Sequence, residues 1–217
     1  MVSAVVLAAG MSTRMGRNKL LLTFRDKPLV VHAVDTLWAS KVGEIIVVLG
    51  HESEKVWDRL EDSCGQMRNE GQRSRVRLVD NPDYREGLST SVRTGVQAVS
   101  READAIMIYL ADQPLLEPAD IDRIIAAFAK GKAENKMIVV PFFKGERGNP
   151  VILDASLRDS ILGIVGDVGC KGVIKRYPEK VYSVEMENDH VVRDVDDVQA
   201  YERLVGYRRL PRSGYRL

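Results

Sequence analysis

The sequence contains little that would place the protein in a membrane, in an oxidising compartment or on a nucleic acid. Two cysteines, Cys64 and Cys170, are too few for a disulfide or metal-binding framework and suit a reducing compartment. With 32 Lys and Arg against 31 Asp and Glu, the formal net charge of +1 gives no sign of nucleic-acid or membrane-surface binding. The apolar N-terminus lacks a basic leader and turns cationic at Arg14, so we expect neither a signal peptide nor a membrane span. These features predict a cytoplasmic protein.

Short apolar runs alternate with longer amphipathic segments, which predicts an α/β fold with a parallel sheet covered on both faces. The expected strands are 2–7, 45–49, 76–79, 105–110, 137–141, 181–185 and 190–195. The expected helices are 28–39, 89–99, 118–129 and 198–204, with Pro28 and Pro118 in first turns and Ser89 as an N-cap. The length suits one domain over 1–205, with parts at about 1–115 and 116–205, and a loosely ordered tail at 206–217.

The loop after the first expected strand has the composition of a phosphate site. Gly10 and Gly16 permit the positive φ that turns successive N–H groups toward one anion, and Arg14 and Lys19 add positive charge. The glycine spacing fits neither a Walker loop nor a dinucleotide fingerprint. A surface loop with solvated cations is the alternative, but strand, glycines and cations together favour phosphate binding.

Two acidic features are typical of a magnesium site. Asp112 follows an apolar strand directly, which places its carboxylate at the sheet edge where open α/β folds bind ligands. Strand alternation puts Asp194 and Asp196 on one face, so one extended segment can aim two carboxylates at the same ion. Mg²⁺ usually takes one or two protein carboxylates together with substrate phosphate oxygens. Helix capping by Asp112 and a solvated acidic turn capped by Asp197 are the structural alternatives.

Three further glycine-framed segments can hold parts of a ligand. Segment 87–95 begins a helix with Ser89, Thr90 and Ser91, whose hydroxyls and free N–H groups suit a base or a ribose, or simple helix capping. Segments 145–150 and 166–171 each carry one cation and suit a second, phosphorylated ligand, or are ordinary turns. The three histidines form no cluster in the sequence and are interpreted as structural or solvated, as is Cys64, while Cys170 has no histidine partner that would support a nucleophilic role.

These motifs together resemble the MobA-like nucleotidyltransferases, most closely their molybdopterin cytidylyltransferase branch. The resemblance extends from residue 2 to about 204. It is carried by LAAGMSTRMGRNK at 7–19, GLSTSVRTG at 87–95, LADQP at 110–114, GERGNPV at 145–151, GDVGCK at 166–171 and DVD at 194–196. It implies a three-layer, Rossmann-like nucleotidyltransferase fold with a mostly parallel central sheet. The family pattern continues with Thr-Pro-Glu-Asp after the last motif, whereas this chain continues with Asp197, Val198, Gln199 and Ala200.

The resemblance implies transfer of CMP from CTP to the terminal phosphate of molybdopterin or its molybdenum-loaded form, with release of pyrophosphate. The catalytic residues would be Lys19, Arg14 and Asp112, and Mg²⁺ would bind to Asp112 and Asp196, with Asp194 as the alternative to Asp196. The nucleotide would contact Leu7, Ala8, Ala9, Gly10, Ser12, Arg14, Lys19, Gly87, Leu88, Ser89 and Asp112. The acceptor would contact Arg147, Gly148, Asn149, Asp167, Gly169 and Lys171. A transient contact with a molybdenum hydroxylase or its maturation factor would deliver the product.

Cytosine is the favoured base, because guanylyl-transferring relatives have glycine at the position of Ala9, where a Cβ should crowd a purine. Three other functions remain open at this point. They are a nucleotidyltransferase for a sugar or polyol phosphate, a guanylyltransferase, and a non-catalytic carrier that binds finished cofactor and passes it to an apo-enzyme.

Overall fold

The central strand of the fold is β1 (Val2–Ala8), whose seven residues are all buried and, apart from Ser3, all apolar. It pairs in parallel with β4 (Glu44–Leu49) on one side and with β6 (Ala105–Leu110) on the other. A strand buried on both faces favours apolar side chains at nearly every position, and the Ser3 hydroxyl donates a hydrogen bond to Glu44 at 2.8 Å. In this computed structural model the described residues are 1–64, 75–166 and 169–206, without the side chains of 63 and 64.

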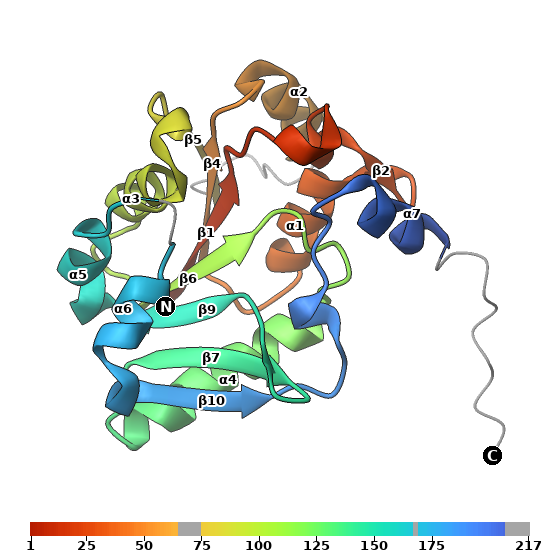
Figure 1. Ribbon diagram of the computed structural model, residues 1–217. Coiled ribbons are helices and arrows are strands. Elements are labelled where there is room, and N and C mark those ends of the chain that lie inside the picture. The colour runs from red at the N-terminus through yellow and green to blue at the C-terminus, as the bar shows by residue number, and fades with distance from the viewer. Residues whose placement is uncertain (65–74, 167–168, 207–217) are drawn as a thin grey trace, which may run out of the picture.

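The sheet extends from this centre in the order β10-β7-β9-β6-β1-β4-β5, and β8 pairs with β7 (Figure 1). Strand β5 (Val76–Asp80) is parallel to β4, and β10 (Val181–Glu185) is parallel to β7 (Ile138–Phe143). Strand β9 (Val151–Asp154) runs antiparallel to both of its neighbours, and β8 (Glu146–Arg147) is antiparallel to β7. The mostly parallel sheet expected from the sequence is confirmed.

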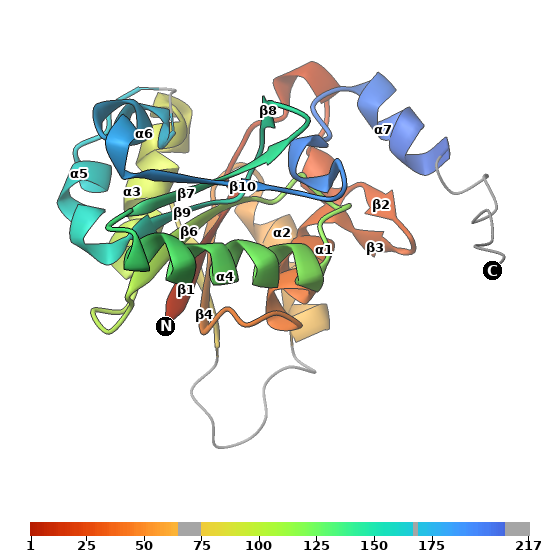
Figure 2. The ribbon, with the colours of Figure 1, turned by 90° about the horizontal axis from the view of Figure 1, so that it is seen from below.

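Helices cover both faces of the sheet and complete the three layers. One core cluster contains side chains of α1 (Leu29–Trp38), α2 (Ser53–Cys64) and α4 (Pro118–Ala133), which runs along its face of the sheet in Figure 2. The other contains side chains of α3 (Leu88–Ala98), α5 (Arg158–Leu162) and α6 (Lys171–Arg176). A Cβ on Gly95 would lie 2.8 Å from Val48 Cγ2 and closer still to Val5, so glycine lets α3 approach the sheet.

A third, smaller cluster ties the C-terminal helix to the N-terminal part of the chain. It joins Met15, Leu22 and Phe24 to Val195 and Leu204. Helix α7 (Val198–Gly206) thereby lies beside the hairpin of β2 (Thr23–Phe24) and β3 (Lys27–Pro28), as both ribbon views show. This packing brings the segment before α7 to the carboxyl ends of β1 and β6.

Three local predictions were wrong. Helix α3 begins one residue earlier than expected with Gly87 at its N-cap, so Ser89 lies inside the helix. Pro28 pairs with Thr23 in the hairpin and precedes α1 instead of lying in its first turn. Residues 190–195 form no strand: His190–Val192 is a 3-10 turn, and an extended segment follows it. Pro118 does open α4, whose N-terminus is closed by a reciprocal capping box between Glu117 and Asp120.

Candidate active site

The loop that follows β1 is held in shape by two residues with left-handed backbone conformation. These are Ser12 (φ 52°) and Gly16 (φ 64°), whereas Gly10 does not have the positive φ expected from the sequence. The Ser12 hydroxyl oxygen accepts a hydrogen bond from the Lys19 backbone N–H at 3.1 Å, which closes the loop on itself. Of the two glycines expected to have positive φ, Gly16 has it and Gly10 does not, and Ser12 supplies the other left-handed residue.

Asn18 fixes the end of this loop, a role that the sequence analysis did not assign. Its side chain is almost fully buried, donates from Nδ2 to the His51 carbonyl at 3.2 Å and accepts from the Leu20 N–H at 3.1 Å. Asn18 is thus the N-cap of the 3-10 turn Lys19–Leu21, and the asparagine before a helical turn was the available sequence signal. The cap determines where the Lys19 side chain begins.

Lys19 lies between the two carboxylates predicted from distant motifs. Its Nζ is 2.5 Å from Asp112 Oδ2 and 3.0 Å from Asp196 Oδ1. The side chains of Lys19 and Asp112 are only 15% and 14% exposed, whereas that of Asp196 is 38% exposed. The exposed Arg14 donates to the other oxygen of Asp196 at 3.2 Å. The fold therefore assembles all four of these predicted residues at the carboxyl ends of the central strands.

The pKa values of this cluster follow from burial and mutual charge. Burial lowers the pKa of Lys19, but the negative charges of Asp112 and Asp196 outweigh it, so the lysine pKa is raised. Burial raises the pKa of Asp196, but the bonds from Lys19 and Arg14 outweigh it, and the net pKa is lowered. Burial and the neighbouring charges of Asp196 and Asp112 raise the pKa of Asp194. Asp196 is thus better held in its ionised form than Asp194.

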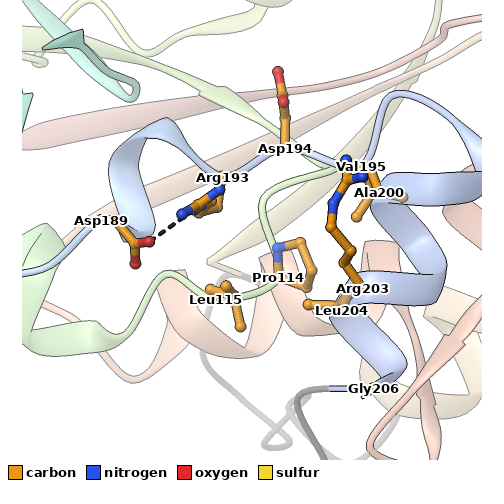
Figure 3. Close-up of a pocket in the computed structure, with 10 residues that line it drawn as sticks. All are labelled: Pro114, Leu115, Asp189, Arg193, Asp194, Val195, Ala200, Arg203, Leu204 and Gly206. Carbon is orange, nitrogen blue, oxygen red and sulfur yellow. Dashed lines mark hydrogen bonds and ion pairs between the residues drawn. The ribbon is translucent and has the colours of Figure 1, made fainter.

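The acidic segment reaches Asp112 through one backbone hydrogen bond. The Val195 N–H donates to the Asp112 carbonyl at 3.0 Å, and the Val195 side chain is buried. Asp194 and Asp196 flank it on the solvent side, and Figure 3 shows the Asp194 carboxylate directed away from Pro114 and Leu115. The alternation expected for a strand therefore survives in an extended segment that belongs to no sheet.

A divalent metal ion fits these residues. Asp112 Oδ1 is buried and has no hydrogen-bond partner among the described residues, so one oxygen of this carboxylate remains to ligate a cation. The described part of the chain contains no preformed cluster of three or more metal-binding side chains. An incomplete set of one or two carboxylates is the arrangement in which Mg²⁺ is usually completed by water and substrate phosphate.

Two of the three hydroxyls expected to contact a base are used within the protein. Asn81 Nδ2 donates to the Thr90 hydroxyl at 2.9 Å and to the Ser91 hydroxyl at 3.0 Å, and all three residues are buried. The Ser89 N–H donates to the Gly166 carbonyl at 3.1 Å. Gly87 has a φ of 115°, so a side chain there would be strained. Nucleotide contacts by Gly87, Leu88 and Ser89 stay predictions.

The expected acceptor residues gather on the other side of the sheet centre. Arg147 on β8 is half-buried, and its guanidinium has no hydrogen bond or ion pair to another described residue. The Gly148 and Asn149 N–H groups donate to the Pro141 and Val191 carbonyls, so neither amide is available to a ligand. Lys171 is exposed at the start of α6, and Asp167 lies outside the described residues.

The buried Cys170 beside Arg147 is a thiol. Burial raises its pKa to about 12, although the positive charge of Arg147 acts in the opposite direction. A thiol with so high a pKa is a poor nucleophile near neutral pH, which agrees with the interpretation from the sequence. Gly169 lies directly before Cys170, and a Cβ on it would lie 3.1 Å from Leu88 Cδ2, so the 166–171 loop meets the start of α3.

Two hollows adjoin the acidic segment and the glycine loop. One of about 360 Å³ is lined by loop residues from Met11 to Asn18 together with His51 and Glu52. The other, of about 380 Å³, lies behind the acidic segment, between Leu115, Arg193, Arg203 and Leu204 (Figure 3). Only the first is formed by the predicted phosphate loop.

None of the helices in the described part of the chain has the length and hydropathy that a membrane crossing requires.

Comparisons with known proteins identify the family of this chain. The chain matches the MobA-like NTP transferase domain over residues 4–181. It is 29% identical to nicotine blue oxidoreductase of Paenarthrobacter nicotinovorans, over 94% of this chain and 96% of that protein. It is 25% identical to the molybdenum cofactor cytidylyltransferase of Escherichia coli K12, over 90% of this chain and 91% of that protein.

Solved structures with a similar fold include proteins that are similar to this chain over nearly its whole length. Rv0371c of Mycobacterium tuberculosis H37Rv is similar with a TM-score of 0.77 and 26% identity, over 94% of this chain and 97% of that chain. Its complex with manganese is similar with a TM-score of 0.68 and 27% identity, over 94% and 98% of the two chains. The chain therefore belongs to the MobA-like NTP transferase family and is a nucleotidyltransferase of that type.

Proposed function

We propose that this nucleotidyltransferase transfers CMP from CTP to the terminal phosphate of molybdopterin, or of its molybdenum-loaded form, and releases pyrophosphate. The observation that carries the proposal is the position of Lys19, with Nζ 2.5 Å from Asp112 and 3.0 Å from Asp196 at the end of the glycine loop. A largely buried cation beside two carboxylates can stabilise a triphosphate and the pyrophosphate that leaves it. Cytosolic location and the hand-over to a molybdenum hydroxylase or its maturation factor belong to the same proposal.

The chain's own residues have to solve a problem of charge and alignment. A phosphate monoester, with a second pKa of about 6, is already largely a dianion at neutral pH, so the acceptor needs no general base. Lys19 and Arg14 oppose the negative charge that develops on the leaving pyrophosphate. Asp112 and Asp196 would hold Mg²⁺, which would neutralise negative charge on the substrate phosphates when it is bound. Asp196 is the better second ligand, because the pKa of Asp194 is raised by burial and by its acidic neighbours.

The choice of CTP is supported by Ala9 and by the cytidylyltransferase relative. Ala9 is 3% exposed, and a Cβ on Gly50 would lie 2.8 Å from the Ala9 methyl group. This methyl group therefore packs against Gly50 directly behind the loop, where a change in its size would alter the space beside the loop. Ala9→Gly should shift the ratio of CTP to GTP turnover toward GTP by about tenfold, the scale of one or two methylene contacts. An unchanged ratio would remove Ala9 from the argument.

The acceptor is supported by the guanidinium of Arg147, whose pKa is lowered by burial. A half-buried arginine that has no hydrogen bond or ion pair within the described part of the chain suits a phosphate of the second substrate. Gly169 and Lys171 lie in the loop that meets α3, on the side expected for the acceptor. Arg147→Lys keeps the charge but loses the planar fork, so it should raise KM for molybdopterin and leave KM for CTP unchanged.

The decisive experiment measures pyrophosphate release with Mg²⁺, molybdopterin and each of CTP, GTP, ATP and UTP. CTP-selective release is expected, with kcat lowered by about two to three orders of magnitude in Lys19→Ala and Asp112→Ala. Lys27→Ala is the matched control, because Lys27 forms a 2.5 Å ion pair with Asp35 away from the site. Turnover with a sugar or polyol phosphate instead, GTP-selective release, or tight binding of finished cofactor without any turnover would each replace this proposal with one of its alternatives.

A further inference from the structure

A second buried polar cluster lies behind the acidic segment, and the proposed reaction does not use it directly. Its centre is Asp120 at the start of α4, whose side chain is 8% exposed. Asp120 accepts hydrogen bonds from His190 Nδ1 at 2.8 Å, Asn188 Nδ2 at 2.9 Å and the Glu117 N–H at 2.9 Å. Asn188 in turn accepts from the His190 N–H at 3.1 Å. The 188–190 turn is thus attached to α4 by side chains.

The next residue along the chain links the turn to two motif loops. The Val191 carbonyl accepts a hydrogen bond from Gln113 Nε2 at 3.0 Å and another from the Asn149 N–H at 2.9 Å. Gln113 is 2% exposed and directly follows Asp112. A Cβ on Gly148 would lie 2.6 Å from the same carbonyl, so this residue must be glycine for the contact to exist. The Val191 carbonyl is therefore bonded both to Gln113, next to the proposed metal ligand Asp112, and to Asn149, in the segment proposed to bind the acceptor.

The acidic segment has little support of its own. Residues 193–196 belong to no helix or strand. Beyond them, Asp197 caps α7 by accepting from the Ala200 N–H at 2.7 Å. Before them, the anchor is the turn that His190 holds to Asp120. Between these two ends, the Val195 N–H donates to the Asp112 carbonyl at 3.0 Å, and the Asp196 carboxylate pairs with Lys19 and Arg14. The backbone that carries Asp196 enters this contact from the turn that His190 and the Val191 carbonyl attach to the rest of the fold.

We propose that Asp120 and His190 are positioning residues for nucleotidyl transfer: their hydrogen bond holds the 188–196 segment so that Asp196 stays at Lys19 and the divalent metal. The inference rests on the proposed metal role of Asp196. The charged groups that face the imidazole are Asp120, Glu117 and Asp189. The ring can donate from Nδ1 in its neutral and its protonated form, so positioning does not depend on its charge.

The test compares His190→Ala, which removes the donor, with His190→Asn, whose amide nitrogen can take the place of Nδ1. Loss of a group that orients a metal ligand typically costs about 10–100-fold in metal affinity or activity. We expect His190→Ala to weaken Mn²⁺ binding in the presence of CTP by about tenfold, measured by electron paramagnetic resonance, and to lower kcat by a similar factor. KM for CTP should change less than twofold, and His190→Asn should restore most of both losses.

Arg158→Ala is the control for general destabilisation. Arg158 donates to the carbonyls of Val96, Val99 and Ser100 near the amino ends of the strands, opposite the site. This variant should lower the urea midpoint of unfolding and leave Mn²⁺ binding unchanged. Unchanged Mn²⁺ binding in His190→Ala, or equal weakening in Arg158→Ala, would overturn the inference. Mn²⁺ binding needs no turnover, so a wild-type protein that binds CTP without turning it over would refute the proposed function and still leave this test decisive. If the wild type binds another nucleoside triphosphate instead of CTP, the same variants are compared with that nucleotide.

Discussion

Replacing Lys19 by methionine should destabilise the protein and inactivate it for two separable reasons. Lys19→Met keeps the apolar length of the side chain and removes the charge between Asp112 and Asp196. Removing one partner of a buried ion pair typically costs about 3–5 kcal/mol, because the other charge is left buried and unpaired. Asp112 is still 14% exposed, so we take the lower end, about 3 kcal/mol. The contact with Asp196 adds little, because that side chain is 38% exposed.

The double variant Lys19→Met, Asp112→Asn separates stability from catalysis. Asparagine carries no charge, so the unpaired carboxylate disappears and most of the lost stability should return. The double-mutant cycle should give a coupling free energy of about 2 kcal/mol, within the range for residues in contact. Activity should not return, since both the cation and the metal ligand are gone, and kcat should stay at least about 100-fold below that of the wild type.

The four proteins of the cycle are the wild type, Lys19→Met, Asp112→Asn and the double variant. Their stability is measured by urea unfolding, followed by tryptophan fluorescence, without nucleotide and with a metal chelator. Pyrophosphate release measures their activity. The role of Lys19 in stability is refuted if the free energy of unfolding of Lys19→Met lies within about 0.5 kcal/mol of that of the wild type, which is a change that ordinary surface substitutions produce. It is also refuted if the double variant is less stable than Lys19→Met.

Two further predictions concern packing and pH. Gly95→Ala places a methyl group against Val5 and Val48. It should lower the free energy of unfolding, measured in urea, by about 1–3 kcal/mol and leave KM for CTP unchanged. A neutral or stabilising effect would contradict the close packing of α3 against the sheet. The hydrogen bond to Asp120 raises the pKa of His190 above its ordinary 6.5, while the pKa of Asp120, despite burial, is lowered from 3.8 by its hydrogen bonds. The raised pKa of His190 contributes to the free energy of unfolding below pH 6.5, and the lowered pKa of Asp120 contributes above pH 3.8. The free energy of unfolding of the wild type should therefore exceed that of His190→Ala by the largest amount between these two pH values. A stability difference that grows toward pH 9 would contradict the interaction between the two residues.

Much of the sheet could be predicted from the sequence, because its central strands are buried on both faces and need unbroken apolar runs. Strands β1, β4 and β6 are of this kind. Strand β9 was missed because it has only four residues, follows a glycine-framed loop and pairs antiparallel with β6, which lies far away in the sequence, as well as with the nearby β7. The alternating pattern at 190–195 suggested a strand, but the Val191 carbonyl bonds to Gln113 and Asn149 instead of a neighbouring strand.

In the site, too, residues with a local sequence pattern could be predicted, whereas residues that depend on distant partners could not. Lys19, Asp112 and Asp196 could be predicted because each carries a charge in a recognisable local pattern. Asn18 offered a local signal as the N-cap of a helical turn, although its bond to the His51 carbonyl depends on the fold. The contact of His190 could not be predicted, since it meets Asp120 across 70 positions of the sequence. A lone histidine at the edge of an element has no local feature that distinguishes a solvated ring from one that holds a loop.

The ion pair between Lys19 and Asp196 spans 177 positions of the sequence, nearly the whole chain. A chain still emerging from the ribosome has its phosphate loop and Asp112 long before the last carboxylate is available. The complete centre therefore requires α7 and the segment before it to pack against the N-terminal hairpin. A chain that has been made only as far as Asp112 has the phosphate loop and one carboxylate, but it lacks the carboxylate of Asp196.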